Sequence, residues 1–279
     1  GGAENIARNP KVSAFAADSL ASGYVSKDGV DQIANIAGVS LASGAGEEAE
    51  VKSFIARVLP DIARNSMTEM TWQARRAENG RIEDSYTFSL APDTGRVLSE
   101  SIVPGGRAES DLGAFIPREF VSATRYDLKN AQVAWRSVLL TARTKTDQVS
   151  GNLLAAFSSS LFEPYGIEDP ELFFRGVWGP IQTIRFDADG DEVVVIARIE
   201  DPEAVRMAVA KELGITKFPF FDLNGPPWAP KRIGSSADGD LAAASNGYVI
   251  IVGDAASVDR CIAASAIAVA DTGPLQTST

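Results

Sequence analysis

The chain has 279 residues, of which 45% are hydrophobic and 23% charged, and its formal net charge is -11 at pH 7. This is the composition of a globular protein with a sizeable core, and the length favours two modest domains over one large one. The acidic balance leaves no excess of cations for a phosphate backbone or an anionic membrane surface, so we expect no nucleic-acid partner. Its longest apolar stretches are far too short to cross a bilayer, so we expect no membrane insertion of this chain.

Two helices are predicted near the N-terminus. After a short extended piece at 23–27, the pattern favours a helix over 28–37. From about residue 47 to 64, apolar side chains recur every three or four residues, with acids in the first turn and Arg64 in the last, which predicts an amphipathic helix. Pro60 predicts a kink or an early end of that helix.

A β-meander is predicted next, because apolar residues alternate with polar ones on both sides of Asn79-Gly80. That dipeptide suits a tight hairpin turn, since both central residues need positive φ. We expect Pro92-Asp93-Thr94-Gly95 to form a second turn, leading into a third strand at about 96–103. The predicted common face of the first two strands consists of Met70, Trp72, Ala74, Ile82, Tyr86, Phe88 and Leu90.

Pro104-Gly105-Gly106 is the best linker candidate, so we predict an N-terminal α+β unit over 1–106 and a C-terminal one over 107–279. The C-terminal unit repeats the order of the first: a short strand, helices, then a hairpin turning at Asp189-Gly190. The fold class is therefore α+β, with two related units that each pair an antiparallel sheet with helices. The order is a common one, so coincidence stays open beside an internal repeat. The helices are predicted at about 129–144, 151–162, 169–174, 201–213 and 255–268, and the strands at 119–127, 181–186, 192–199 and 248–252.

The absence of histidine excludes the largest classes of catalytic and metal chemistry. No Ser-His-Asp or Cys-His arrangement and no histidine-bound zinc or iron site can be assembled within this chain. A phosphate-binding glycine loop and a nucleophile elbow are also missing. We therefore predict no catalytic residues and no cofactor, and interpret the single cysteine, Cys261, as a small buried hydrophobe. A carboxylate-based hydrolase such as a glycosidase stays open, because two acids suffice for that reaction.

The run 187–192 resembles a calcium loop, because carboxylates stand at alternating positions. An EF-hand needs glycine at its sixth position and glutamate at its twelfth, and this chain has Glu192 and Arg198 there. The run also lies between two predicted strands, where Asp-Gly is ordinary turn chemistry. We predict no metal site.

The candidate binding residues are aromatic. Trp72 and Trp135 fall on predicted core faces, whereas Trp178 and Trp228 stand between glycines and prolines, where we expect loops. Around Trp228, the segment 218–228 holds four aromatic residues in a rigid proline frame, which lowers the entropy lost on binding. A structural cap over the core is the alternative. The predicted binding residues are Phe220, Phe221, Asp222, Trp228 and Trp178.

The second half resembles bacterial envelope proteins that carry a repeated strand-helix domain of unknown function. Three segments carry the resemblance: 115–122, 169–174 and 246–254. It implies an exported or surface-anchored protein and supplies no site residues. The sequence therefore predicts a non-catalytic binding or scaffold protein outside the cytoplasm, whose partner is a protein, a peptide or a small molecule.

Overall fold

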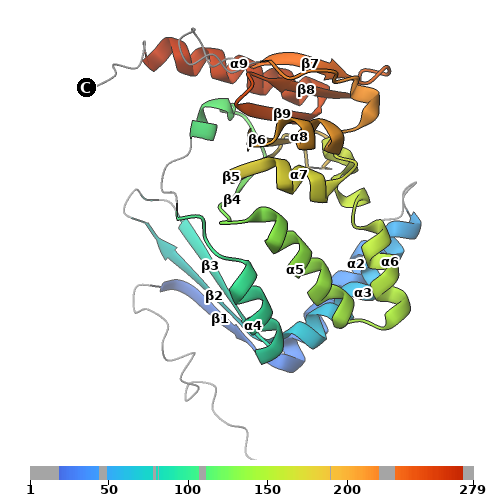
Figure 1. Cartoon of the computed structure of the whole chain (residues 1–279). Coiled ribbons are helices and arrows are strands. Elements are labelled where there is room, and N and C mark those ends of the chain that lie inside the picture. The colour runs from blue at the N-terminus through green and yellow to red at the C-terminus, as the bar shows by residue number, and fades with distance from the viewer. Residues whose placement is uncertain are drawn as a thin grey trace, which may run out of the picture. The chain divides into compact units, whose positions relative to one another are not determined.

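The computed structural model describes residues 19–43, 49–77, 80, 82–106, 111–188, 190–219 and 230–272. The chain divides into two compact units, the first made of residues 1–99 and 139–155, the second of 100–138 and 156–279 (Figure 1). Each unit contains helices and one antiparallel sheet, which confirms the predicted α+β class. The proposal that the two halves are related units, and the domain boundary placed after residue 106, stay predictions. None of the described helices is long and apolar enough to span a membrane.

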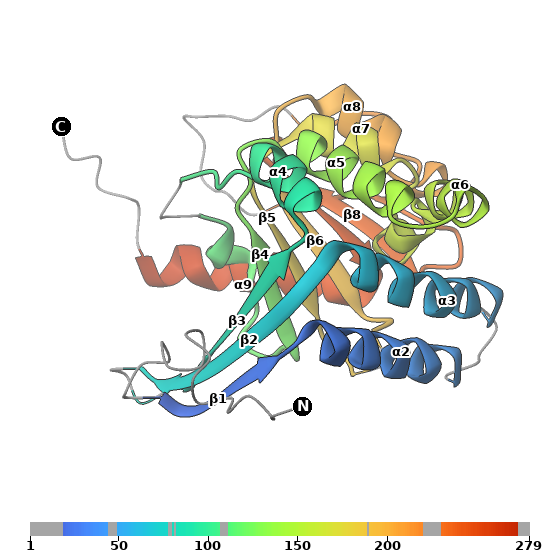
Figure 2. The ribbon, with the colours of Figure 1, turned by 90° about the horizontal axis from the view of Figure 1, so that it is seen from below.

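The first unit is built on a three-stranded sheet with the order β1-β2-β3. Strand β1 (Ser19–Val25) runs directly into helix α2 (Lys27–Ser43), and helix α3 (Ala49–Ser66) runs directly into β2 (Met67–Arg76), as Figure 2 shows. Strand β3 (Ile82–Leu90) pairs Phe88 with Met70 and Tyr86 with Trp72. The predicted common face is thus present. Tyr86 and Phe88 are more than half exposed, however, so it is not a closed core face.

Helices α2 and α3 pack closely because a glycine faces a backbone carbonyl. A Cβ atom added at Gly38 would lie 2.4 Å from the carbonyl oxygen of Ala56. Around this contact Val30, Ala34, Phe54 and Val58 are buried. Helix α3 continues through Pro60 to Ser66, so that proline does not end it early.

The strand predicted at 96–103 is wrong, because that segment forms helix α4 (Pro92–Ser101). Pro92 and Asp93 were interpreted as a turn, but proline and an acid are equally favoured in the first turn of a helix. Thr94, Val97 and Leu98 then recur at helical spacing and lie buried or half-buried. The third strand of this sheet is β1, which pairs with β2.

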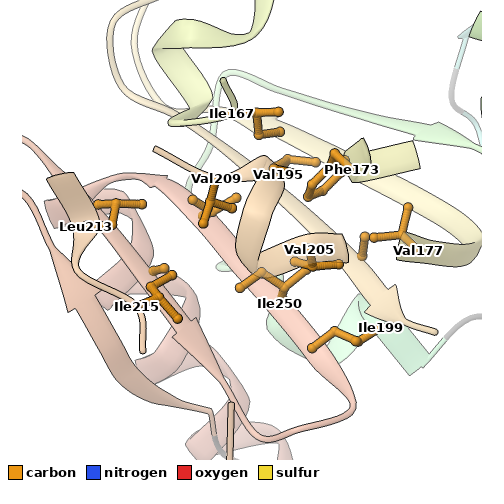
Figure 3. Packing of buried hydrophobic residues seen from close by; sticks show 14 of the residues in the cluster. Ile167, Phe173, Val177, Val195, Ile199, Val205, Val209, Leu213, Ile215 and Ile250 are labelled. Atoms are coloured by element: carbon orange, nitrogen blue, oxygen red, sulfur yellow. The ribbon is translucent and has the colours of Figure 1, made fainter. Parts of the chain in front are cut away.

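The second unit is built on a six-stranded, fully antiparallel sheet with the order β4-β5-β6-β9-β8-β7. Its inner strands are buried on both faces, which explains continuous apolar runs such as 193–197. One face packs on helices α7 (Pro170–Gly176) and α8 (Pro202–Ala208) through a cluster that includes Phe173, Val205 and Ile250 (Figure 3). The other face packs on α9 (Ala255–Thr272) through Val258 and Cys261. The strands are β4 (Ser122–Tyr126), β5 (Val177–Arg185), β6 (Val193–Ile199), β7 (Lys231–Ser235), β8 (Leu241–Ser245) and β9 (Val249–Asp254).

Two short helices of the second unit begin at aspartate caps. Asp169 accepts a hydrogen bond from the backbone N–H of Leu172, and Asp201 accepts bonds from Glu203 and Ala204. The predicted helix starts at these two aspartates are confirmed. The helical segments are η2 (Asp111–Phe115), α5 (Ala131–Thr144), α6 (Gln148–Phe157), η3 (Ser160–Tyr165), α7 (Pro170–Gly176), α8 (Pro202–Ala208), η4 (Lys211–Leu213) and α9 (Ala255–Thr272).

Candidate functional site

Of the predicted binding residues, Trp178 is the one that the structure describes. Phe220, Phe221, Asp222 and Trp228 lie outside the described residues. Trp178 is not in a loop, as the sequence predicted, but near the start of β5. The following Gly179-Pro180 breaks the register between β5 and β6 at this point, and Gly179 has φ +70°, a left-handed conformation that glycine tolerates best. The glycine and proline therefore mark a bulge in a strand, a device that re-aims neighbouring side chains.

Trp178 borders a pocket of about 330 Å³ that lies within the second unit. One wall is formed by the end of β4 and the residues after it. A second wall is the first turn of α5, and the third consists of the end of α7 with the start of β5. The segment 103–105 closes the wall after β4, because Gly105 donates its N–H to the carbonyl of Asp127, and Lys129 donates to Val103. Segments far apart in sequence thus meet at one hollow.

The Trp178 side chain forms the aromatic wall of the pocket, and the guanidinium group of Arg198 stacks on it. The guanidinium of Arg198 lies 5.0 Å from the ring centre of Trp178 and 5.4 Å from that of Tyr248. Arg198 is the cross-strand partner of Trp178 in β6, so the pairing of the two strands brings the groups together. Such cation–π contacts contribute about 0.5–2 kcal/mol each, and here they restrict the Trp178 indole.

Asp127 borders the pocket, and one oxygen of its carboxylate is closed off from solvent. Its Oδ2 atom lies 3.4 Å from a guanidinium nitrogen of Arg125. Its Oδ1 atom is buried and has no hydrogen-bond partner among the described residues. A Cβ atom at Gly105 would come within 2.2 Å of that oxygen, so Oδ1 packs directly against Gly105 and a larger residue at 105 would displace it. A buried carboxylate oxygen without a donor is costly, and such an atom calls for an explanation.

The helix that forms the second wall is fixed to α7 by a shared carboxylate. Glu171 accepts a hydrogen bond of 3.0 Å from Nε of Arg136 and one of 3.5 Å from the side chain of Gln132, which borders the pocket. The Arg136 guanidinium holds the pKa of Glu171 below its ordinary value, so this contact persists at neutral pH. Beneath it, Trp135 packs edge-on against Phe162 and at a tilt against Phe174. The ion pair and the aromatic contacts therefore join two walls of the pocket.

The charges that line the pocket balance, although the chain as a whole is strongly acidic. Asp127 and Glu200 contribute the negative charges, and Lys129 and Arg175 the positive ones. Glu200 is placed here because its backbone N–H bonds to the carbonyl of Gly176 at the end of α7. The N-terminus of α5 adds partial positive charge, since the leading N–H groups of a helix have no partners within it.

A second hollow, of about 460 Å³, lies in the first unit beside the start of α6. Its polar groups largely bond to one another or to neighbouring residues. Lys145 pairs with Asp93 at 2.6 Å, Asn65 donates to the carbonyl of Lys145, and Asp147 caps α6 by accepting from the N–H groups of Val149 and Ser150. These contacts already engage most of the polar groups that line the hollow. It is therefore the weaker candidate for a binding site.

The run that resembled a calcium loop forms a turn. Asp187 accepts hydrogen bonds from the backbone N–H groups of Gly190, Asp191 and Glu192, at 3.0 to 3.2 Å, so its oxygens are engaged with the chain itself. Across the described part of the chain, no three His, Cys, Asp or Glu side chains gather in a way that could hold a metal ion.

No protein-family model, no curated protein and no solved structure matches this chain. The similarity to envelope proteins stays a resemblance on three segments, and the site must be interpreted from its own geometry.

The polar residues of the pocket were not predicted from the sequence. Asp127, Lys129 and Glu200 stand at the ends of predicted strands or just before predicted helices, positions where binding groups concentrate. That signal was available but weak, because many other acids and lysines occupy similar positions. Their meeting depends on the pairing of β4 with β5, which the sequence alone does not specify.

Proposed function

We propose that this chain is a non-catalytic binding protein that takes a small polar molecule into the pocket beside Trp178. The observation that carries the proposal is the combination, in one pocket of about 330 Å³, of the Trp178 side chain with two acidic and two basic residues. Small-molecule sites combine concave shape with a few fixed polar groups in this way. The location outside the cytoplasm is part of the proposal and rests on the resemblance of the second half to envelope proteins.

The first test is a thermal-shift screen of the full chain with glucose, glycerol, L-alanine, L-glutamate and succinate. A molecule that binds only the folded state raises the melting temperature in a concentration-dependent way. We expect at least one of these probes to do so in the wild type and not in Trp178→Ala. Trp72→Ala, which removes a tryptophan from the first unit, is the matched control and should keep the response. If no probe shifts the wild type, or if Trp178→Ala responds equally, the proposed site is wrong.

A carboxylate-based hydrolase is the second candidate, because Asp127 and Glu200 border the same pocket as Trp178. Most glycoside hydrolases use a pair of carboxylates, and an aromatic side chain beside them can stack on the sugar. Against it, the Asp127 carboxylate lies 3.4 Å from a guanidinium nitrogen of Arg125, so one of its oxygens is already engaged in an ion pair. The test is release of nitrophenol from a panel of nitrophenyl glycosides. Turnover that Asp127→Asn and Glu200→Gln both abolish would establish the enzyme and overturn the non-catalytic proposal.

A further inference from the structure

One side of the three-stranded sheet in the first unit, which we call the Tyr86 face, is apolar but open. The strand register places Tyr86 next to Trp72 and Phe88 next to Met70 on this side. Ile82, Tyr86 and Phe88 of β3 are each more than half exposed. The apolar side of a sheet is ordinarily covered by another layer, and an exposed apolar patch marks a surface that binds a partner. The Tyr86 face is therefore a candidate interface.

The opposite side of β3 is polar, so only the Tyr86 face needs a cover. Glu83, Ser85 and Thr87 alternate with the apolar residues along the strand and lie on that opposite side. This alternation is typical of an antiparallel sheet with one side packed and the other in water. A partner is thus expected on the Tyr86 face alone.

The Tyr86 face carries one negative and one positive residue near the β2–β3 hairpin. Asp84 lies opposite Ala74, and Arg76 lies opposite Ile82. Trp72 donates a hydrogen bond of 3.1 Å from Nε1 to Asp84, which holds this carboxylate beside the aromatic rings. No ion pair joins Asp84 or Arg76 to another residue that the structure describes. An aromatic centre with charged groups at its margin is the usual anatomy of a protein interface.

We propose that the Tyr86 face binds the Tyr86 face of a second copy, so that two sheets stack across a two-fold axis parallel to the strands. Such an axis places β2 of one copy over β3 of the other, with Trp72 over the partner's Tyr86. Arg76 then lies two residues along the strand, about 7 Å, from the partner's Asp84, a distance that its side chain can span. One base and one acid on the same face are complementary across the axis, as a contact between identical surfaces requires. The pocket beside Trp178 lies in the second unit, so this inference does not depend on it.

The size of the Tyr86 face sets the affinity that we expect. Strand β3 has nine residues and the sheet three strands. At about 3.4 Å per residue and about 4.8 Å between strands, the face measures about 30 by 14 Å. Interfaces of this small size belong to reversible complexes. We therefore expect a dimer with a dissociation constant of about 1 to 100 μM.

Sedimentation velocity of the full chain, from about 1 to about 500 μM, tests the proposal. The average mass should rise with concentration from the 29.5 kDa of one chain towards twice that value. Phe88→Lys puts a charge on the apolar face and should weaken association at least about tenfold. Thr87→Lys, the next residue on the polar side, is the matched control and should associate like the wild type. Both residues are exposed, so neither variant disturbs a core. A wild type that stays monomeric throughout, or equal behaviour of the two variants, overturns the proposal.

A charge exchange between copies tests the two-fold arrangement. Arg76→Asp alone and Asp84→Arg alone each place like charges opposite one another across the axis, so each variant should dimerise less tightly than the wild type. An equimolar mixture of the two restores opposite charges at both contacts and should associate at least about tenfold more tightly than either variant alone. A mixture that associates no better than its components overturns the proposal.

A membrane surface is the alternative occupant of an apolar face. The net charge of -11 opposes an anionic leaflet, so the probe is a vesicle of neutral phosphatidylcholine. We expect no co-sedimentation of the chain with these vesicles. Co-sedimentation that Phe88→Lys abolishes and Thr87→Lys preserves, in a chain that stays monomeric, would assign the face to lipid and overturn the dimer.

Discussion

Cys261 lies on α9 and packs fully buried against the six-stranded sheet. Desolvation raises the pKa of its thiol to about 12, with a small opposing effect from Arg260. Because the thiolate is the reactive form, this thiol should be inert in the folded protein.

The prediction is that a chromogenic disulfide reagent, added at mildly alkaline pH, does not label the native chain and labels one thiol per chain at once in denaturant. Rapid labelling of the native protein would show that α9 leaves the sheet readily, contrary to the packing described.

Asp187 is the residue whose protonation should weaken the β5–β6 hairpin. Partial burial pushes the pKa of its carboxyl up, but three backbone N–H groups that bond to it push the pKa down further, so the net shift is downward. A lowered pKa in the folded state means that the unfolded chain takes up the proton first on acidification. The stabilisation is therefore complete above the ordinary carboxyl pKa and is lost as the pH falls through the folded-state value.

We expect Asp187→Asn to lower stability at neutral pH and to show a smaller further loss on acidification than the wild type. Urea denaturation at neutral pH and at about pH 3 measures both differences. An identical acid-induced loss in the variant and the wild type would contradict the assigned role.

At the scale of residues, the sequence led to Trp178 through its glycine and proline neighbours, although those neighbours form a bulge and not a loop. Arg198, which stacks on Trp178, could not be predicted, because its position opposite depends on the strand register. Asp127 was equally hidden. Its distinguishing feature, one oxygen without a donor, exists only once Gly105 and β4 have come together.

At the scale of elements, the contact between α2 and α3 depends on Gly38. Replacing Gly38 with alanine would place Cβ 2.4 Å from the Ala56 carbonyl oxygen, so the helices would have to separate. We expect Gly38→Ala to lower the free energy of unfolding by about 1–3 kcal/mol.

Gly95 in α4 offers the matched control. A Cβ there meets its nearest neighbour, Cβ of Leu90, at an ordinary 3.8 Å. Gly95→Ala should therefore leave stability unchanged or raise it by up to about 1 kcal/mol, from helix propensity. Chemical denaturation of both variants measures the contrast, and equal effects would show that the 38–56 contact is not tight.

Elements with strong local signals were predictable, and elements set by tertiary context were not. The helices that begin at Asp169 and Asp201 carry proline after the capping acid, and both were predicted. Strand β8 was missed because Ala242, Ala243 and Ala244 are intrinsic helix formers. They form a strand since all three are completely buried between β7 and β9, where small side chains suit packing on both faces. The strand predicted within 92–101 was wrong for a different reason. The local signals there are strong, but the same residues favour both a turn and the start of a helix.

At the scale of the whole molecule, the class of fold followed from the alternation of helical and strand patterns, and the antiparallel sheets followed from the hairpin turns. The strand order β4-β5-β6-β9-β8-β7 did not, because it brings β9 between β6 and β8 out of chain order. That order places the buried strands 193–199 and 249–254 side by side in the core of the second unit. Composition gave the net charge of -11, but it could not indicate a pocket in which charges balance.

The central claim is that the pocket beside Trp178 binds a small polar ligand, and a two-dimensional ¹H–¹⁵N spectrum of the indole N–H groups tests it most directly. The chain has four tryptophans, and Trp178→Phe assigns the resonance of interest. On titration with L-alanine, the Trp178 indole signal should shift saturably while that of Trp72, in the first unit, stays in place. If none of the probes named above moves the Trp178 signal, or if the Trp72 signal moves instead, the account of the site is wrong.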